Sequence, residues 1–195
     1  VEYWLTPIYK GKSAQGSCIR CHNEGKEVEG GDLLWKGKRL FEDLGCYGCH
    51  DTLGFGEDKR RMIGPGLRNI KNKVGAKWIT AWIKDPKGFR PTTLMPDFRL
   101  TEEEAQAIAA YLWQHADEKG IYEEMPAFDD EQLSQGDFLF EQMGCMACHT
   151  YEKDAERGFA PNLARISEKI NYGYLVEWIM NPQGKEPLTR MPSFR

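Results

Sequence analysis

All six cysteines of the chain fall into three copies of one pentapeptide, and each copy ends in a histidine. The copies begin at Cys18, Cys46 and Cys145, have their second cysteine at Cys21, Cys49 and Cys148, and end at His22, His50 and His149. This C-x-x-C-H pattern is the attachment signature of c-type haem. Two thiols bond to the two vinyl groups of one porphyrin, and the adjacent histidine binds its iron. The sequence therefore predicts three covalently bound haem c groups, each with a proximal histidine.

Three other uses of paired cysteines fit this pattern poorly. Disulfides within C-x-x-C pairs would be strained and would leave each following histidine unexplained. Three such units cannot be divided into closed four-ligand zinc sites without a remainder. A thioredoxin-like redox motif needs a βαβ pattern around it, and the sequence shows none.

An internal repeat organises most of the chain. The segment 37–46 matches 136–145 at an offset of 99 residues. After the haem motif the offset becomes 96. It first matches Pro65-Gly66-Leu67 with Pro161-Asn162-Leu163, and it still holds at the M-P-x-F sequences that begin at Met95 and Met191. A register held over about sixty residues indicates a duplicated structural unit.

The elements that must position these motifs are helices. Asp32 is expected to cap a first helix that ends near Gly45. Residues 76–84 carry apolar side chains at helical spacing up to Pro86. Thr101 and Glu104 form a capping-box pattern that opens a helix through about Ala116. No convincing strand pattern occurs, so the predicted fold class is all-α.

Composition excludes several function classes. The 195 residues are 41% hydrophobic and 29% charged, with a mean hydropathy of −0.62, which is typical of a globular soluble chain. The longest apolar run, residues 107–113, is far shorter than the roughly 20 residues of a membrane span. A net charge of −4 argues against nucleic acid as the main partner.

Both repeats resemble class I cytochrome c domains. The resemblance implies an N-terminal extension (1–31) with the first haem, a class I domain (32–117) with the second, a linker (118–131) and a second class I domain (132–195) with the third. It also implies that Met95 and Met191 are sixth iron ligands, and that the carbonyls of Pro65 and Pro161 orient the proximal imidazoles. The family's last helix has no counterpart in this sequence after Phe194.

The first haem motif lacks a methionine loop of its own, because only nine residues separate His22 from Asp32. Its sixth ligand must therefore come from elsewhere in the chain or from outside it. His115, the one histidine outside the three motifs, is the first candidate. Met125 is the second, because Met125-Pro126-Ala127-Phe128 repeats the M-P-x-F pattern. An open iron remains a further alternative.

Charge is unevenly distributed along the sequence. Residues 117–131 hold seven acidic side chains against one lysine, which is typical of a surface linker. The first repeat instead gathers basic residues. These are Lys59, Arg60, Arg61, Arg68, Lys71, Lys73, Lys77, Lys84, Lys87 and Arg90. The pattern predicts either an ordinary solvated face or a positive rim that steers an acidic redox partner.

No catalytic constellation is visible in the sequence. We therefore expect a non-enzymatic electron carrier of a respiratory chain, located in the bacterial periplasm or outside the cell, where haem of this kind is attached. One alternative is a subunit of a larger or filamentous electron-conducting complex. Another is a haem peroxidase or gas-binding protein, which would require an open first haem.

Overall fold

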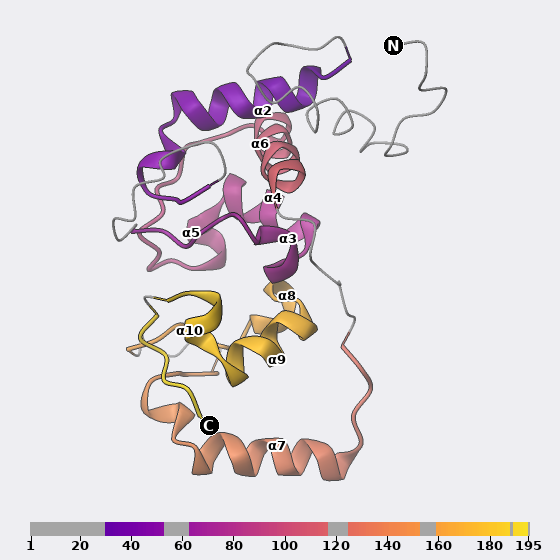
Figure 1. Cartoon of the computed structure of the whole chain (residues 1–195), viewed down its shortest axis with the longest axis vertical. Helices are drawn as coiled ribbons and strands as arrows, with labels where there is room; N and C mark the ends of the chain where they lie inside the picture. Colours follow the sequence, from indigo (N-terminus) through magenta and orange to yellow (C-terminus); the bar gives the residue numbers. More distant parts are fainter. Residues whose placement is uncertain (1–29, 53–62, 117–124, 153–158, 188, 195) are drawn as a thin grey trace. The chain divides into compact units, whose positions relative to one another are not determined.

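The structure is a computed structural model that describes residues 30–52, 63–116, 125–152, 159–187 and 189–194. Helices dominate these residues, and no strand occurs among them, which confirms the predicted all-α class (Figure 1). The elements are α2 (Asp32–Asp43), η2 (Cys46–Gly48), α3 (Ile70–Lys73), α4 (Ala76–Lys84), α5 (Pro86–Phe89), α6 (Glu102–His115), α7 (Asp130–Gln142), η3 (Cys145–Ala147), α8 (Ile166–Lys169), α9 (Tyr172–Met180) and α10 (Pro182–Lys185). The first haem motif, Cys18–His22, lies outside the described residues.

The predicted helix boundaries hold with one correction. Helix α4 has the predicted bounds, and α6 ends at His115, one residue before the predicted end. Asp32 is not the N-cap of α2. Gly31 occupies that position, and Asp32 is the first helical residue. There its carboxylate still favours the helix because it lies at the positive end of the helix dipole.

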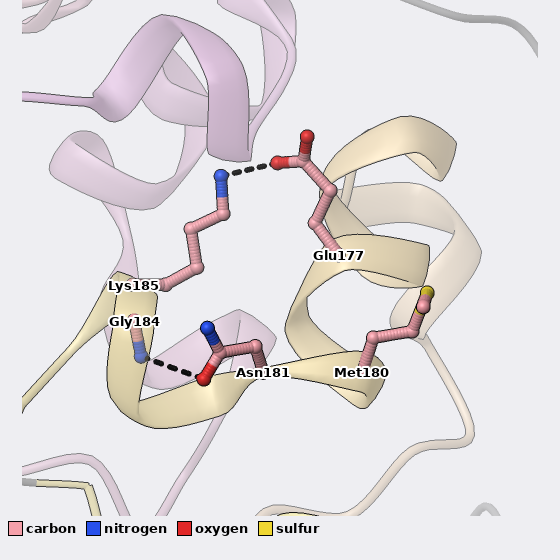
Figure 2. Close-up of a pocket in the computed structure, with 5 residues that line it drawn as sticks. All are labelled: Glu177, Met180, Asn181, Gly184 and Lys185. Atoms are coloured by element: carbon pink, nitrogen blue, oxygen red, sulfur yellow. Dashed lines mark hydrogen bonds and ion pairs between the residues drawn. The ribbon is translucent and has the colours of Figure 1, made fainter. Parts of the chain in front are cut away.

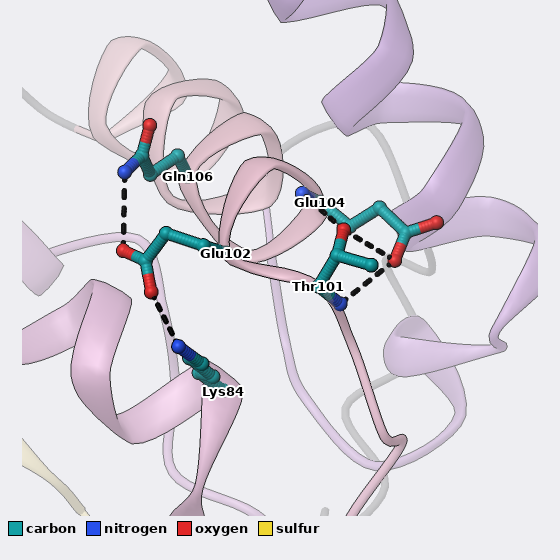
Figure 3. Close-up of polar contacts among 5 residues, drawn as sticks. All are labelled: Lys84, Thr101, Glu102, Glu104 and Gln106. Atoms are coloured by element: carbon teal, nitrogen blue, oxygen red, sulfur yellow. Dashed lines mark hydrogen bonds and ion pairs between the residues drawn. The ribbon is translucent and has the colours of Figure 1, made fainter.

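The start of α6 is fixed by polar contacts that the sequence predicts. The Thr101 side chain accepts a hydrogen bond from the backbone N–H of Glu104, and the Glu104 carboxylate accepts one from the backbone N–H of Thr101 (Figure 3). Lys84 at the end of α4 donates to Glu102 at 2.7 Å. These contacts lower the pKa of both glutamates, because each holds its carboxylate in the charged form.

The chain divides into two compact units. The first comprises residues 1–71 and 79–118, and the second comprises residues 72–78 and 119–195. In the first unit α2 lies across α6, and apolar side chains of both helices form the core (Figure 1). Phe41 and Tyr111 are each 1% exposed, with ring centroids 5.6 Å apart. Ile70, Ile79 and Ile83 extend this core toward α3 and α4.

The second unit has a smaller core. Val74 and Asn171 are almost fully buried in it, and an isolated antiparallel bridge joins Val74 to Ile170. The backbone N–H of Asn171 donates to the carbonyl of Lys73 at 3.0 Å, and the Asn171 side chain caps α9. By contrast, α7 contains no buried residue.

Candidate haem-binding sites

Each described haem motif begins directly after a helix that ends at a glycine in the left-handed conformation. Gly45 has φ 68° and Gly144 has φ 70°, and glycine adopts such angles without a steric penalty. The chain then turns through η2 or η3, and the carbonyl of the first cysteine accepts a hydrogen bond from the histidine N–H. That bond measures 3.0 Å for Cys46 and His50, and 2.9 Å for Cys145 and His149. One local fold thus holds two thiols and an imidazole in each motif.

Both proximal histidine candidates make the same contact. Nδ1 of His50 lies 2.8 Å from the carbonyl oxygen of Pro65, and Nδ1 of His149 lies 2.8 Å from that of Pro161. Because a carbonyl oxygen only accepts hydrogen bonds, Nδ1 must carry the proton in each ring. This leaves the lone pair on Nε2, the nitrogen that can bind a metal. Burial also lowers the pKa of His50, which favours the neutral ring.

Backbone hydrogen bonds hold the proline loops against the motifs. In the first repeat the N–H of Gly64 donates to the carbonyl of Cys49 at 2.8 Å, and that of Leu67 donates to Asp51 at 2.8 Å. In the second repeat, the corresponding donors are Ala160 and Leu163, which bond to Cys148 and Thr150 at 2.9 and 2.7 Å. The proline carbonyl is therefore positioned by backbone contacts on both sides.

The two methionine loops also share one geometry. The indole N–H of Trp82 donates to Sδ of Met95 at 2.9 Å, and that of Trp178 donates to Sδ of Met191 at 2.9 Å. The hydroxyl of Thr93 accepts a bond from the backbone N–H of Met95 at 3.2 Å. Thr189 makes the same contact to Met191 at 3.3 Å. Each thioether is thus fixed at both its backbone and its sulfur.

Sequence reasoning missed the role of the two tryptophans and the two threonines. In the sequence, Trp82 is one of the apolar residues at helical spacing within 76–84, and Trp178 occupies the matching position at the 96-residue offset. A signal is nevertheless present, because each tryptophan precedes its methionine by 13 residues in both repeats. The spacing alone could not identify a hydrogen bond. The contact forms only because α5 reverses the chain between Trp82 and Met95, and α10 does so between Trp178 and Met191.

Capped short helices provide that return. Helix α5 begins at Pro86 and is capped by Asp85, whose carboxylate accepts a bond from Gly88 N–H at 2.8 Å. Helix α10 begins at Pro182, and Asn181 accepts the corresponding bond from Gly184 at 3.2 Å. Proline suits the first position of a helix because its missing N–H would have no partner there.

A pocket lies beside the second of these helices. It is lined by Glu177, Met180, Asn181, Gly184 and Lys185 (Figure 2). An ion pair between Lys185 and Glu177 lies at this pocket. Its lining includes no residue of a haem motif or methionine loop, so we do not associate it with haem.

The residues of both sites fit a c-type haem. The thiols of Cys46, Cys49, Cys145 and Cys148 are free, as attachment to vinyl groups requires. Large apolar side chains flank the ligand candidates at the surface, including Ile63 (75% exposed), Leu94 (79%) and Phe159 (97%). A porphyrin needs such apolar surface around it. Within the described residues, no group of His, Cys, Asp and Glu forms a site for a bare metal ion.

The structure describes both candidate sixth ligands of the first haem, but not the motif itself. His115 is half-buried at the end of α6, and its Nδ1 lies 3.3 Å from the Tyr111 carbonyl, so Nε2 again keeps the lone pair. Burial lowers the pKa of His115, and the nearby charges of Lys38 and Lys71 lower it further. Met125 is 54% exposed.

Comparison with protein families finds cytochrome c domains in this chain. Residues 35–116 match the cytochrome c family, and residues 6–51 match the family of cytochrome c554 and c-prime. The second match includes both the first and the second C-x-x-C-H motifs. Cytochrome c domains imply covalently bound haem c, and they support a role in electron transport.

Three curated proteins are similar to part of the chain. A subunit of nitric oxide reductase from Stutzerimonas stutzeri is 30% identical over 92 residues, which cover 44% of this chain and 60% of that protein. The same subunit from Paracoccus denitrificans is 29% identical over 86 residues, or 40% of this chain and 55% of that protein. Cytochrome c oxidase subunit 2 of Alkalihalophilus pseudofirmus is 32% identical over 89 residues, which cover 41% of this chain and 25% of that protein.

The chain thus spans between a quarter and about 60% of the length of these relatives. No solved structure matches it significantly. In the part of the chain that the structure describes, no helix is long and apolar enough to cross a membrane.

Proposed function

We propose that this chain is a three-haem c-type cytochrome that passes single electrons between redox partners. The observation that carries the proposal is the repetition of one hydrogen-bonded arrangement in both repeats. In each, a C-x-x-C-H turn has its histidine bonded to a proline carbonyl, and a methionine sulfur accepts a tryptophan N–H. Two independent copies of this arrangement indicate that the imidazole and the thioether are held for the same purpose twice.

In this proposal Cys46 and Cys49 bind the second haem, with His50 and Met95 as its iron ligands. Cys145, Cys148, His149 and Met191 do the same for the third. The haem supplies an iron that alternates between Fe(II) and Fe(III), and a neutral thioether favours Fe(II) and raises the potential. The chain holds the two ligand atoms of each site in place, and if both bind the iron no position would remain there for water.

The first haem is assigned to Cys18, Cys21 and His22, with His115 as the proposed sixth ligand and Met125 as the alternative. The match of residues 6–51 to a cytochrome family supports a haem at this motif. A bis-histidine haem has a lower potential than a histidine–methionine haem. The three haems would then form an ordered path for electrons.

Haem quantification combined with a carbon monoxide difference spectrum of the reduced protein tests this proposal. We expect three haems per chain and no carbon monoxide binding. Fewer than three haems would overturn the haem count. Carbon monoxide binding to one haem in three would overturn six-coordination of the first haem and favour the gas-binding or peroxidase alternative.

A second candidate function is membership of a larger respiratory complex. It is favoured by the relatives, which are named as subunits of nitric oxide reductase and cytochrome c oxidase. The proposed location is the periplasm or the cell exterior. Copurification of the chain with a fixed set of other proteins from membranes, at constant stoichiometry, would support this role over that of a free carrier.

Salt should slow electron exchange with an acidic partner if the basic residues of the first repeat form a steering surface. Lys84 and Lys87 are exposed, although Lys84 is also paired with Glu102 and Lys87 also donates to the Thr93 carbonyl. Screening shortens the reach of these charges to roughly 8 Å at physiological ionic strength. We expect the second-order rate constant, measured by stopped flow, to fall as salt rises, and to fall less steeply for Lys84→Gln plus Lys87→Gln. A salt-independent rate would indicate an ordinary solvated face.

Replacing Trp82 with phenylalanine should lower the potential of the second haem. The indole N–H withdraws electron density from the Met95 sulfur, and its loss makes that sulfur a better donor to Fe(III). A neutral hydrogen bond contributes about 0.5–1.5 kcal/mol, which corresponds to roughly 20–60 mV for one electron. Spectroelectrochemical titration measures the shift, and Trp78→Phe on the same helix controls for loss of an indole. An unchanged potential would contradict the proposed role of Trp82.

A further inference from the structure

A lysine from the first repeat is built into the second compact unit, to which residues 72–78 belong. The carbonyl of Lys73 accepts a hydrogen bond from the backbone N–H of Asn171 at 3.0 Å. The next residue, Val74, pairs with Ile170 in the isolated bridge. These two backbone contacts fix Lys73 at the start of α9, so its side chain is held beside the aromatic residues of that helix.

The ammonium group of Lys73 lies over two stacked rings of α9. Its Nζ is 5.7 Å from the ring centroid of Tyr174 and 5.7 Å from that of Trp178. The two rings are nearly parallel, with an angle of 17° between their planes and 6.1 Å between their centroids. A cation at this distance from an aromatic face is attracted by the negative charge of the ring. Lys73 therefore makes a cation–π interaction with both rings.

Little water screens this charge. The Lys73 side chain is 18% exposed, and Tyr174 is buried. Burial lowers the pKa of Lys73, because it removes water from the ammonium group, whereas Glu186 at 3.7 Å raises the pKa by favouring the charged form. A charge in this position acts on the side chains around it more strongly than on an approaching partner.

One of the two rings connects Lys73 to a candidate haem ligand. Trp178 donates its indole N–H to Sδ of Met191 at 2.9 Å. A cation on the face of an indole draws electron density out of the ring, which makes its N–H a stronger donor. The stronger hydrogen bond withdraws density from the sulfur, so the sulfur becomes a weaker donor to Fe(III). A nearby positive charge also favours the reduced iron, because reduction adds an electron. Both effects have the same sign.

We propose that Lys73 is a positioning residue that raises the potential of the third haem, acting through the Trp178 indole. The inference rests on the proposed function, in which Met191 binds the third iron. Glu186 opposes the effect, because its carboxylate partly compensates the ammonium charge. The potential of the third haem is therefore set in part by an ion pair that joins the end of α3 to the residue after α10.

Opposite charge changes at this ion pair test the proposal. The starting protein is the haem-loaded chain with Met95→His, in which the sulfur-to-iron charge-transfer band reports the third haem. Lys73→Met should lower the equilibrium constant for reduction of that haem at least about threefold, equivalent to roughly 30 mV for one electron. Glu186→Gln should raise it, because the ammonium charge is then uncompensated. Potentiometric titration followed through the band measures both shifts at pH 6, between the ordinary pKa values of glutamate and lysine.

Two further variants separate this role from a structural one. Lys73→Arg keeps a cation that can stack on the rings, so it should keep the potential. Lys169→Met removes a lysine from the matching position of the repeat, where Nζ lies 5.2 Å from the centroid of the Trp78 ring. It should shift the third haem less than Lys73→Met does. An equal shift would indicate a general effect of charge and overturn the role assigned to the indole.

The two charge variants also decide the proposal by sign. Shifts in the same direction for Lys73→Met and Glu186→Gln, or no shift for Lys73→Met, would overturn it, since a structural disturbance has no reason to reverse with charge. Absence of the band from the Met95→His protein would instead contradict iron ligation by Met191, and with it the proposed function. A band that is present at an unchanged potential would overturn the role of Lys73 alone.

Discussion

Replacing Met95 with histidine should lower the potential of the second haem by a few tenths of a volt. Axial ligands set haem potentials over a range of about 0.8 V, and a histidine–methionine pair lies toward its upper part. The thioether is a weak donor that stabilises Fe(II), whereas imidazole stabilises Fe(III). The fall should be larger than that expected for Trp82→Phe, because the ligand itself is exchanged and not only its hydrogen bond.

Potentiometry and optical spectra of the oxidised protein measure this effect. The weak long-wavelength band of sulfur-to-iron charge transfer should lose the contribution of the second haem. Met191→His should produce the same change at the third haem, because Trp178 and Thr189 hold Met191 as Trp82 and Thr93 hold Met95. Met180→His is the control, since Met180 is 60% exposed on α9. A potential that stays the same in Met95→His would show that Met95 does not bind iron.

Replacing Gly37 with alanine should strongly destabilise the first unit. Its new Cβ would overlap the Ala107 carbonyl at 2.0 Å and lie 2.9 Å from Cβ of Tyr111. The carbonyl belongs to a helix backbone, so the contact can be relieved only by moving α2 away from α6. Overpacking of this kind costs roughly 3 kcal/mol, equivalent to a fall in Tm of roughly 10–20 °C for a unit of this size.

Gly136→Ala is the matched control for this prediction. The same substitution at the equivalent position of the repeat meets no atom of the described residues within 4 Å. It should raise stability by roughly 0.5–1 kcal/mol, because alanine loses less conformational entropy than glycine in a helix. Thermal unfolding of the two variants should therefore shift in opposite directions. Equal shifts would contradict the different environments of the two glycines.

The local elements of the fold were predictable because their signals lie within a few residues. The capping box at Thr101 and the bounds of α4 follow from side chains that act on their own helix. The sequence places the N-cap of α2 one residue late, since Gly31 and Asp32 are adjacent residues that both suit a helix start. Such one-residue choices depend on backbone angles that composition does not specify.

The sequence by itself determined the cytochrome c character, because haem attachment requires a fixed spacing of cysteines and histidine. It also determined the all-α class and the repeat, because helical spacing and matching segments are both visible along the chain. Contacts between distant residues were decided only by the tertiary structure. The proton on Nδ1 of His50 follows from a carbonyl 15 residues away, and the bond from Trp82 to Met95 depends on α5. Gly37 and Gly136 look alike in sequence, and only the packing of the described residues shows that a helix crosses the first and not the second.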